Sequence, residues 1–142
     1  MKNEKKKVVE SYFKAFGNGD MESVLNHFHP DCFIVSVKDD LRDEGQLHGS
    51  YRGKNEASVF LSNIARLFET KSFDVDLVSE TEGDVVYANG SFAHEVKATG
   101  KMFYSDWVQR CVIQDGLIKE YRFYEDSAAY HLAADESLIE VS

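Results

Sequence analysis

Alternation of apolar and polar residues over the second half of the chain, from Phe73 to Tyr124, most constrains what this sequence can fold into. A period of two places successive side chains on opposite faces of a strand. The turn sequences Glu82-Gly83-Asp84, Thr99-Gly100-Lys101 and Asp115-Gly116 divide this stretch into four runs. Since both residues of an Asp-Gly pair tolerate a positive φ, that pair favours a tight hairpin. The pattern predicts an antiparallel meander of four strands.

The first half of the chain predicts the helices that cover one face of this sheet. Apolar residues recur at helical spacing from Glu4 to Phe16, and Gly17 is expected to end that helix in a left-handed cap. Asp20 is expected to cap a second helix, which Pro30 closes. A third helix is predicted from Glu56 to Glu69, with its apolar residues on one face.

Two short strands are predicted among these helices. Cys32–Val37 is rich in β-branched and aromatic residues, and Gln46–Tyr51 is expected to pair back on it after a solvated, mobile acidic loop at Asp39–Glu44. Ser127 is expected to cap a short terminal helix. A long antiparallel sheet that curls around the helices gives an α+β, cone-shaped fold. In this fold three N-terminal helices pack in the concave face of a strongly curved antiparallel sheet, within a single domain of residues 1–142.

The charge of the chain excludes several partners. A formal net charge of −9 repels phosphate groups, so we expect no nucleic acid partner and no membrane partner, and Lys5–Lys7 is too short a basic cluster to change this. Without a secretory signal or a membrane-spanning stretch, a cytoplasmic location is expected. Cys32 and Cys111 lie far apart in sequence and are expected to be separate, reduced, buried thiols.

The parity of the predicted strands indicates which side chains face the core. If Trp107 faces inward, alternation identifies the other inward residues on its own strand, on the preceding strand and on the last strand. These are Phe92, His94 and Val96; Phe103, Ser105, Gln109 and Cys111; and Tyr121, Phe123 and Glu125. Most are apolar, as a core requires. His94, Gln109 and Glu125 are polar, and polar residues at core-facing positions are candidates for a functional site.

The order of elements and four short phrases resemble the nuclear transport factor 2-like superfamily, and within it the SnoaL-like and ketosteroid isomerase-like proteins. The phrases are Tyr12-Phe13-x3-Gly17-x-Gly19-Asp20, His29-Pro30-Asp31-Cys32-Phe33, Tyr51-x-Gly53 and Asp115-Gly116-Leu117-Ile118-x-Glu120-Tyr121. The resemblance runs from about Val8 to about Ala133. It implies a cystatin-like cone, a pocket lined by the concave sheet face and the first and third helices, and a homodimer formed through the convex face.

Carried over residue by residue, the resemblance argues against two of the known activities. It places the first-helix tyrosine of ketosteroid isomerases on Tyr12, but their two aspartates near Ser36 and Gln109. A hydroxyl or an amide cannot replace a titrating carboxylate in proton abstraction beside a ketone. The last-strand aspartate of SnoaL-type cyclases is aligned with Phe123. Steroid isomerisation and cyclisation by that route are therefore both disfavoured.

Two polar residues are candidates for acid–base chemistry. An inward imidazole at His94 could exchange a proton with a substrate, and is expected within hydrogen-bond reach of Tyr12 or Gln109. The alternative is a core histidine whose hydrogen bonds are satisfied by the protein. Glu125, near the end of its strand, is either an orienting group for His94 or a base at the pocket mouth, or a solvated rim residue.

Other histidines are assigned no chemistry. His48 follows the acidic loop and is interpreted as an exposed loop residue at the rim of the pocket. His27, His29 and Asp31 superficially suggest a metal site, but residues two apart on a helix point in different directions and Pro30 imposes its own turn. We therefore expect no metal and no cofactor.

Two functional hypotheses from different classes remain. One is cofactor-independent acid–base chemistry on a small apolar or cyclic molecule, of the isomerase, dehydratase, cyclase or hydrolase type. The other is a non-catalytic ligand-binding or dimerisation module. The candidate catalytic residues are Tyr12, His94 and Glu125. The candidate ligand-binding residues are Phe16, Ser36, Phe92, Trp107, Gln109, Tyr121 and Phe123.

Overall fold

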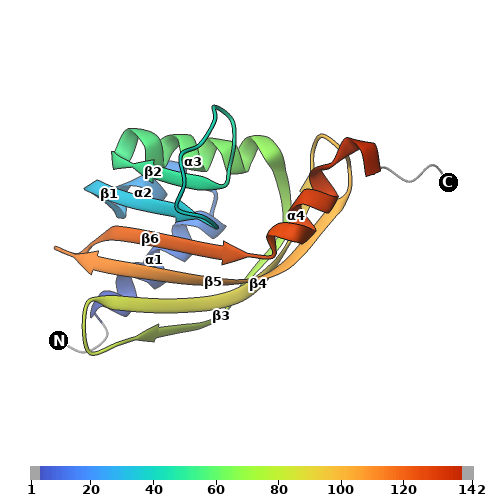
Figure 1. Cartoon of the computed structure of the whole chain (residues 1–142). Coiled ribbons are helices and arrows are strands. Elements are labelled where there is room, and N and C mark those ends of the chain that lie inside the picture. Colours follow the sequence, from blue (N-terminus) through green and yellow to red (C-terminus); the bar gives the residue numbers. More distant parts are fainter. Residues whose placement is uncertain (1–3, 139–142) are drawn as a thin grey trace.

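The predicted meander forms the larger part of one curved sheet. In the computed structural model, which describes residues 4–138, four strands follow one another antiparallel. They are β3 (Phe68–Glu80), β4 (Val85–Val96), β5 (Met102–Gln114) and β6 (Leu117–Glu125). Two shorter strands, β1 (Phe28–Ser36) and β2 (Gly49–Arg52), extend it to the order β2-β1-β6-β5-β4-β3. Strand β1 lies parallel to β6, while β2 pairs antiparallel with β1 (Figure 1).

The helices lie where the apolar pattern predicts them. Helices α1 (Glu4–Gly17), α2 (Met21–Asn26) and α3 (Gly53–Leu67) come before the meander, and α4 (Ser127–Ala134) with a 3₁₀ turn (Glu136–Leu138) follows it. In Figure 1, α1 lies behind the sheet, α3 runs along it and α4 closes one end. The predicted α+β cone, with helices packed in the concave face of the sheet, is confirmed.

Irregular pairing allows the sheet to curl. The register between β3 and β4 shifts between Thr70 and Ser72, and again between Val75 and Leu77. Such bulges bend a strand and increase its twist. At Gly90 the two strands approach so closely that a β-carbon would overlap the carbonyl oxygen of Asp74. A residue without a side chain is therefore required here, next to the second register shift.

Several predicted boundaries were wrong. Gly17 is the last residue of α1, and the left-handed conformation occurs at Gly19, with φ of +70°. Asp20 caps α2 as predicted, accepting from the Ser23 N–H at 3.1 Å. Helix α2 nevertheless ends at Asn26, and Pro30 lies within β1. Pro30 is tolerated there because it falls in the irregular interval of the β1–β6 pairing, where its missing N–H leaves no ladder bond unmade.

The cap of α4 differs from the prediction, and the acidic loop after β1 makes contacts that the sequence did not predict. The cap of α4 is Asp126 and not Ser127, since the Asp126 carboxylate accepts from the Ala129 N–H at 2.9 Å. The acidic loop after β1 has exposed carboxylates, but its chain is tied down by Arg42. The guanidinium donates to the carbonyls of Ser50 and Gln46, each at 3.2 Å, and lies 3.6 Å from the Tyr51 ring centroid.

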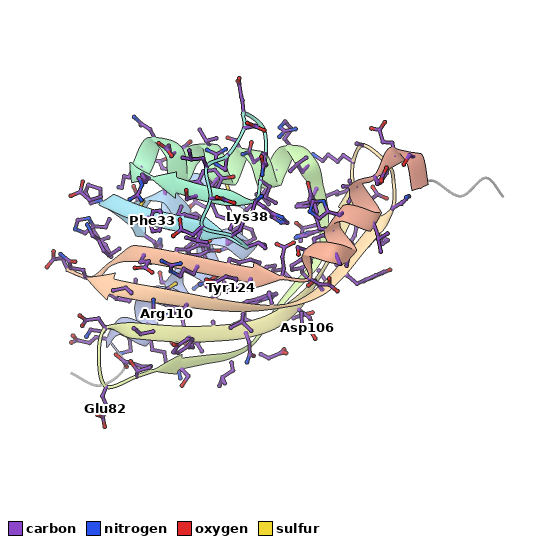
Figure 2. All side chains as sticks on the ribbon, in the orientation of Figure 1. Phe33, Lys38, Glu82, Asp106, Arg110 and Tyr124 are labelled. Atoms are coloured by element: carbon purple, nitrogen blue, oxygen red, sulfur yellow. The ribbon has the colours of Figure 1, made fainter. Side chains whose placement is uncertain are left out.

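The parity prediction is confirmed by burial. Inward residues of β4, β5 and β6 are buried, while Asp106, Tyr104 and Tyr124 on the opposite face are exposed. Figure 2 shows Asp106, Arg110 and Tyr124 on the outer face of the sheet, opposite α1. Both cysteines are free and buried, as predicted. None of the helices among the described residues combines the length and hydropathy needed to cross a membrane.

Candidate functional site

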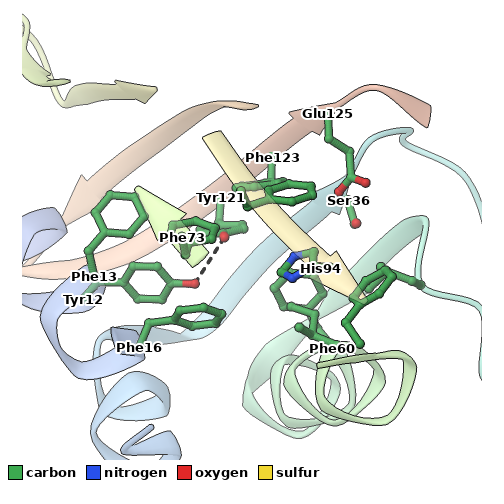
Figure 3. A pocket seen from close by; sticks show the side chains of 14 residues that line it. Tyr12, Phe13, Phe16, Ser36, Phe60, Phe73, His94, Tyr121, Phe123 and Glu125 are labelled. Atoms are coloured by element: carbon green, nitrogen blue, oxygen red, sulfur yellow. Dashed lines mark hydrogen bonds between the residues drawn. The ribbon is translucent and has the colours of Figure 1, made fainter. Parts of the chain in front are cut away.

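A mostly aromatic cavity lies between the concave sheet face and helices α1 and α3 (Figure 3). Including its open mouth it encloses about 480 Å³, of which about 40 Å³ has room for the centre of a water molecule. The smaller figure is the one to compare with small-molecule sites of about 300–1,000 Å³, and it shows that the lining side chains fill most of this space, so that a ring-sized ligand has to displace some of them. Its lining residues are Tyr12, Phe13, Phe16, Ser36, Leu47, Phe60, Ile64, Phe68, Phe73, Phe92, His94, Tyr121, Phe123 and Glu125.

One end of the cavity is closed by a pair of buried tyrosines. The hydroxyl of Tyr12 on α1 donates to that of Tyr121 on β6 at 3.1 Å, and their rings meet edge to face. Burial raises the pKa of both phenols well above its ordinary value. Both hydroxyls therefore stay protonated, and each already has a partner within the protein. This end is suited to holding the helix against the sheet.

His94 lies inside the cavity, stacked between two phenylalanines. Its ring centroid is 4.6 Å from that of Phe68 and 4.2 Å from that of Phe92. Nδ1 is 3.0 Å from the Thr70 hydroxyl, so the expected bond to Tyr12 or Gln109 was wrong. The reason is that β3 pairs with β4 and places Thr70 directly opposite His94.

The stacking also determines the charge of His94. Burial lowers the pKa of the imidazole to about 4. The ring is therefore neutral at pH 7. If the Thr70 hydroxyl donates to Nδ1, Nε2 carries the ring hydrogen. His94 is then a hydrogen-bond donor rather than a group that changes its charge near neutrality.

The other end of the cavity carries polar groups that are not paired. Ser36 ends β1, Glu125 ends β6, and His94 faces them from β4, as Figure 3 shows. Within the part of the chain that the structure describes, neither the Ser36 hydroxyl nor Nε2 of His94 has a hydrogen-bond partner. A hydroxyl, a carboxylate and a neutral imidazole thus converge on one end of an aromatic space.

Glu125 also contacts a residue outside the cavity. Its Oε2 lies 3.6 Å from Nε2 of His48, and both side chains are almost completely buried, at 5% and 6% exposure. Neither atom has a hydrogen-bond partner among residues 4–138. The interpretation of His48 as an exposed loop residue was therefore wrong. The loop held by Arg42 turns back toward the sheet and buries Leu47, His48 and Gly49 together.

Of the ten residues proposed for the site from sequence, the structure brings eight around this cavity. Trp107 and Gln109 lie outside it. The Trp107 ring packs behind the wall against Phe73 and Phe123, and the Gln109 amide donates to Sγ of Cys111 at 3.3 Å. Strand parity gave their inward direction correctly. It could not tell the cavity from the solid core beneath it.

Sequence reasoning missed further lining residues. Phe60 and Ile64 come from the apolar face of α3, and Phe68 and Phe73 from the first strand of the meander. Their helical spacing and alternation were visible, but such patterns indicate burial in general. His48 carried no signal, since its burial depends on where a loop folds back.

The described residues offer no metal site. Among residues 4–138, no group of three or more His, Cys, Asp or Glu side chains is placed to hold an ion. In the motif considered from sequence, His27 Nδ1 lies 2.6 Å from the Ser23 carbonyl and Nε2 lies 2.8 Å from the Ser11 hydroxyl. Both ring nitrogens of His27 are thus already occupied.

Comparison with known proteins identifies the family. Three solved structures share the fold: an NTF2-like protein from Burkholderia xenovorans LB400 (22% identity, TM-score 0.80, 94% of this chain and 97% of the other), TerC co-crystallised with polyporic acid (21%, 0.74, 92% and 98%), and a candidate polyketide cyclase from Pseudomonas putida KT2440 (16%, 0.74, 92% and 98%). No curated protein matches the chain. The model of the SnoaL-like domain matches residues 9–121, and the chain therefore belongs to the SnoaL-like family within the NTF2-like fold.

Proposed function

We propose that this protein binds a small, mostly apolar, ring-bearing molecule in the cavity, with a polar group of that molecule directed at Ser36, His94 and Glu125. The observation that carries the proposal is the contrast within one cavity between aromatic walls and unpaired polar groups at one end. Aromatic walls favour flat apolar rings, and a few convergent polar groups fix their orientation. TerC, which shares the fold, was co-crystallised with polyporic acid, and this is compatible with a small-molecule ligand for the present chain.

A cavity-filling substitution tests this proposal. Ile64 lines the cavity from α3, and Ile64→Trp should fill it and abolish saturable binding of 2-naphthol, measured by equilibrium dialysis. Val59 lies on the same helix and is 42% exposed, so Val59→Trp is the matched control and should bind like the natural sequence. Circular dichroism verifies that both variants are folded. Equal binding by Ile64→Trp would show that the probe binds elsewhere.

Cofactor-independent proton transfer is the second candidate function. It is favoured by the carboxylate of Glu125 beside a neutral imidazole, since a carboxylate can remove a proton from carbon while a donor stabilises the enolate oxygen. Isomerase, dehydratase and cyclase reactions can contain such a step, whereas a hydrolase reaction would use the carboxylate to remove a proton from water. In this scheme Tyr12 orients the ring and does not exchange a proton.

Hydrogen–deuterium exchange tests the catalytic candidate without a known substrate. With 2-tetralone in D₂O, the protein should accelerate exchange at the carbon beside the carbonyl, followed by NMR. Glu125→Gln should lower that rate by at least about tenfold while 2-tetralone still binds. No acceleration by the natural sequence would leave ligand binding as the function.

The outer face of the sheet supports a proposed homodimer. Leu77, Tyr87, Tyr104, Val108 and Tyr124 expose apolar surface there, between 39% and 66% each. Large exposed apolar side chains on one sheet face fit a second copy related by a two-fold axis. Sedimentation should give a dimer at micromolar concentration and a monomer for Val108→Arg. A monomeric natural sequence would refute the dimer.

A cytoplasmic location remains a prediction. Two free, buried thiols are compatible with a reducing compartment, where disulfides are rare. Fractionation of cells with an antibody to the protein would test it.

A further inference from the structure

The wall between the cavity and the surface contains a histidine that faces the carboxylate of Glu125. Leu47 lines both the cavity and an outer groove between α4 and the loop after β1, where about 610 Å³ has room for water. His48 lines only the groove and Glu125 only the cavity. The two side chains therefore meet across the wall, with Nε2 of His48 toward Oε2 of Glu125.

The position of His48 is fixed from three sides. The Gln46 amide donates to the His48 carbonyl at 3.0 Å, and the Tyr51 hydroxyl donates to the neighbouring Leu47 carbonyl at 2.6 Å. The imidazole ring lies 4.7 Å from the ring centroid of Tyr130 on α4. The His131 ring lies 6.1 Å away on the same helix, so bonds to the backbone and two neighbouring rings restrict the direction in which Nε2 points.

Apolar packing alone does not explain why Nε2 of His48 and Oε2 of Glu125 are buried facing each other. Each is buried with no hydrogen bond among the described residues, and a buried polar atom left in this way destabilises the fold. At 3.6 Å they are less than 1 Å from hydrogen-bond distance. A small rotation of either side chain would pair them, with imidazole Nε2–H as donor and carboxylate oxygen as acceptor.

The two oxygens of Glu125 have different surroundings. Oε2 is fully buried against His48 and has no hydrogen bond among the described residues. Oε1 is less deeply buried, and Glu125 lines the cavity. A carboxylate that is held through one oxygen presents the other in a fixed direction. The charge of Glu125 also reaches Tyr130: burial raises the pKa of that phenol, and the carboxylate raises it further.

We propose that His48 is a positioning residue for Glu125, and that together they make the cavity select ligands that carry a hydroxyl at their polar end. The inference rests on the proposed function. His48 holds Oε2, and Oε1 accepts the hydrogen bond of the ligand hydroxyl. A ligand that lacks the hydroxyl leaves a buried carboxylate oxygen unpaired, and a site built to bond a hydroxyl discriminates strongly against such an analogue.

A matched pair of probes tests this selectivity. 2-Naphthol and naphthalene differ only in the hydroxyl, and equilibrium dialysis gives both affinities. The natural sequence should bind 2-naphthol at least about tenfold more tightly, the ratio that a hydrogen bond to a charged group supports. His48→Phe keeps the ring against Tyr130 but removes the donor, and should lower the ratio about fivefold or more with naphthalene affinity unchanged. His48→Gln retains a donor at the position of Nε2 and should restore the ratio.

Controls and contrary outcomes separate this inference from the proposed function. Lys38→Gln, at an exposed residue that lines the same groove, should leave the ratio unchanged. An equal loss of both affinities in His48→Phe, or an unchanged ratio, would overturn the positioning role. A ratio near one in the natural sequence would overturn the selectivity while ligand binding stands. If neither probe binds, the proposed function fails as well. Should His48→Phe not fold, His48→Met provides the same comparison.

Discussion

The two ends of the cavity use polar groups in opposite ways. At the closed end, the hydroxyls of Tyr12 and Tyr121 bond to each other, and burial keeps both protonated. At the other end, Ser36, His94 and Glu125 present polar atoms that the described residues leave unpaired. Polar groups paired within a protein contribute to its stability, whereas unpaired ones are available to a ligand. The difference fits a structural role at one end and the proposed recognition of a ligand at the other.

The largest effect that we expect is on the pH dependence of folding stability. His94 has a pKa of about 4 in the folded protein instead of 6.5. As pH falls through about 6.5, the unfolded chain takes up a proton that the folded protein accepts only near pH 4. Folding stability should therefore decline across this window, by about 3 kcal/mol in total from this residue.

Urea denaturation at several pH values between 7 and 4 measures that decline. His94→Phe preserves the stacking with Phe68 and Phe92 but cannot bind a proton. Its stability should fall less steeply than that of the natural sequence over the same window. Identical slopes would mean that His94 is protonated as readily in the folded protein as in the unfolded chain.

A smaller effect is expected at the closed end. Tyr12→Phe removes one hydroxyl and leaves that of Tyr121 buried without its partner, which should destabilise the protein by about 1–3 kcal/mol in urea denaturation. Adding Tyr121→Phe should cost less than the sum of the single substitutions, because the pair is lost only once. Tyr104→Phe, at an exposed tyrosine, is the control. Strict additivity would argue against a shared hydrogen bond.

The smallest effect should come from Ser36. Its hydroxyl has no partner among the described residues, so Ser36→Ala should change the free energy of unfolding by less than about 0.5 kcal/mol. The affinity for 2-naphthol should decrease more than that for naphthalene. A loss of stability as large as that of Tyr12→Phe would erase the difference between the two ends.

The fold could be predicted because its signals are local and repeated. Alternation, Asp-Gly turns and helical spacing each act over a few residues, and together they gave the meander, the helices and the inward parity of His94 and Glu125. Pro30 misled the prediction because proline usually ends helices, whereas here it lies in an irregular interval of a strand.

The candidate site was predictable only where it coincides with those patterns. Parity directs Phe123 and Gln109 equally inward, but only contacts in space show that Phe123 borders the cavity and that Gln109 is packed against Cys111. The burial of His48 follows from Arg42 and Gln46 tying the loop back, through bonds to backbone carbonyls that leave no mark on the sequence pattern.

The parallel pairing of β1 with β6 has a consequence for the order of folding. Ser36 near the start of the chain lies beside Phe123 near its end, while strands β3, β4 and β5 pair only with sequence neighbours. Contacts between distant segments require closure of a long loop and form slowly. During synthesis the hairpins can assemble as they leave the ribosome, but the cavity cannot exist until β6 has emerged and inserted between β1 and β5.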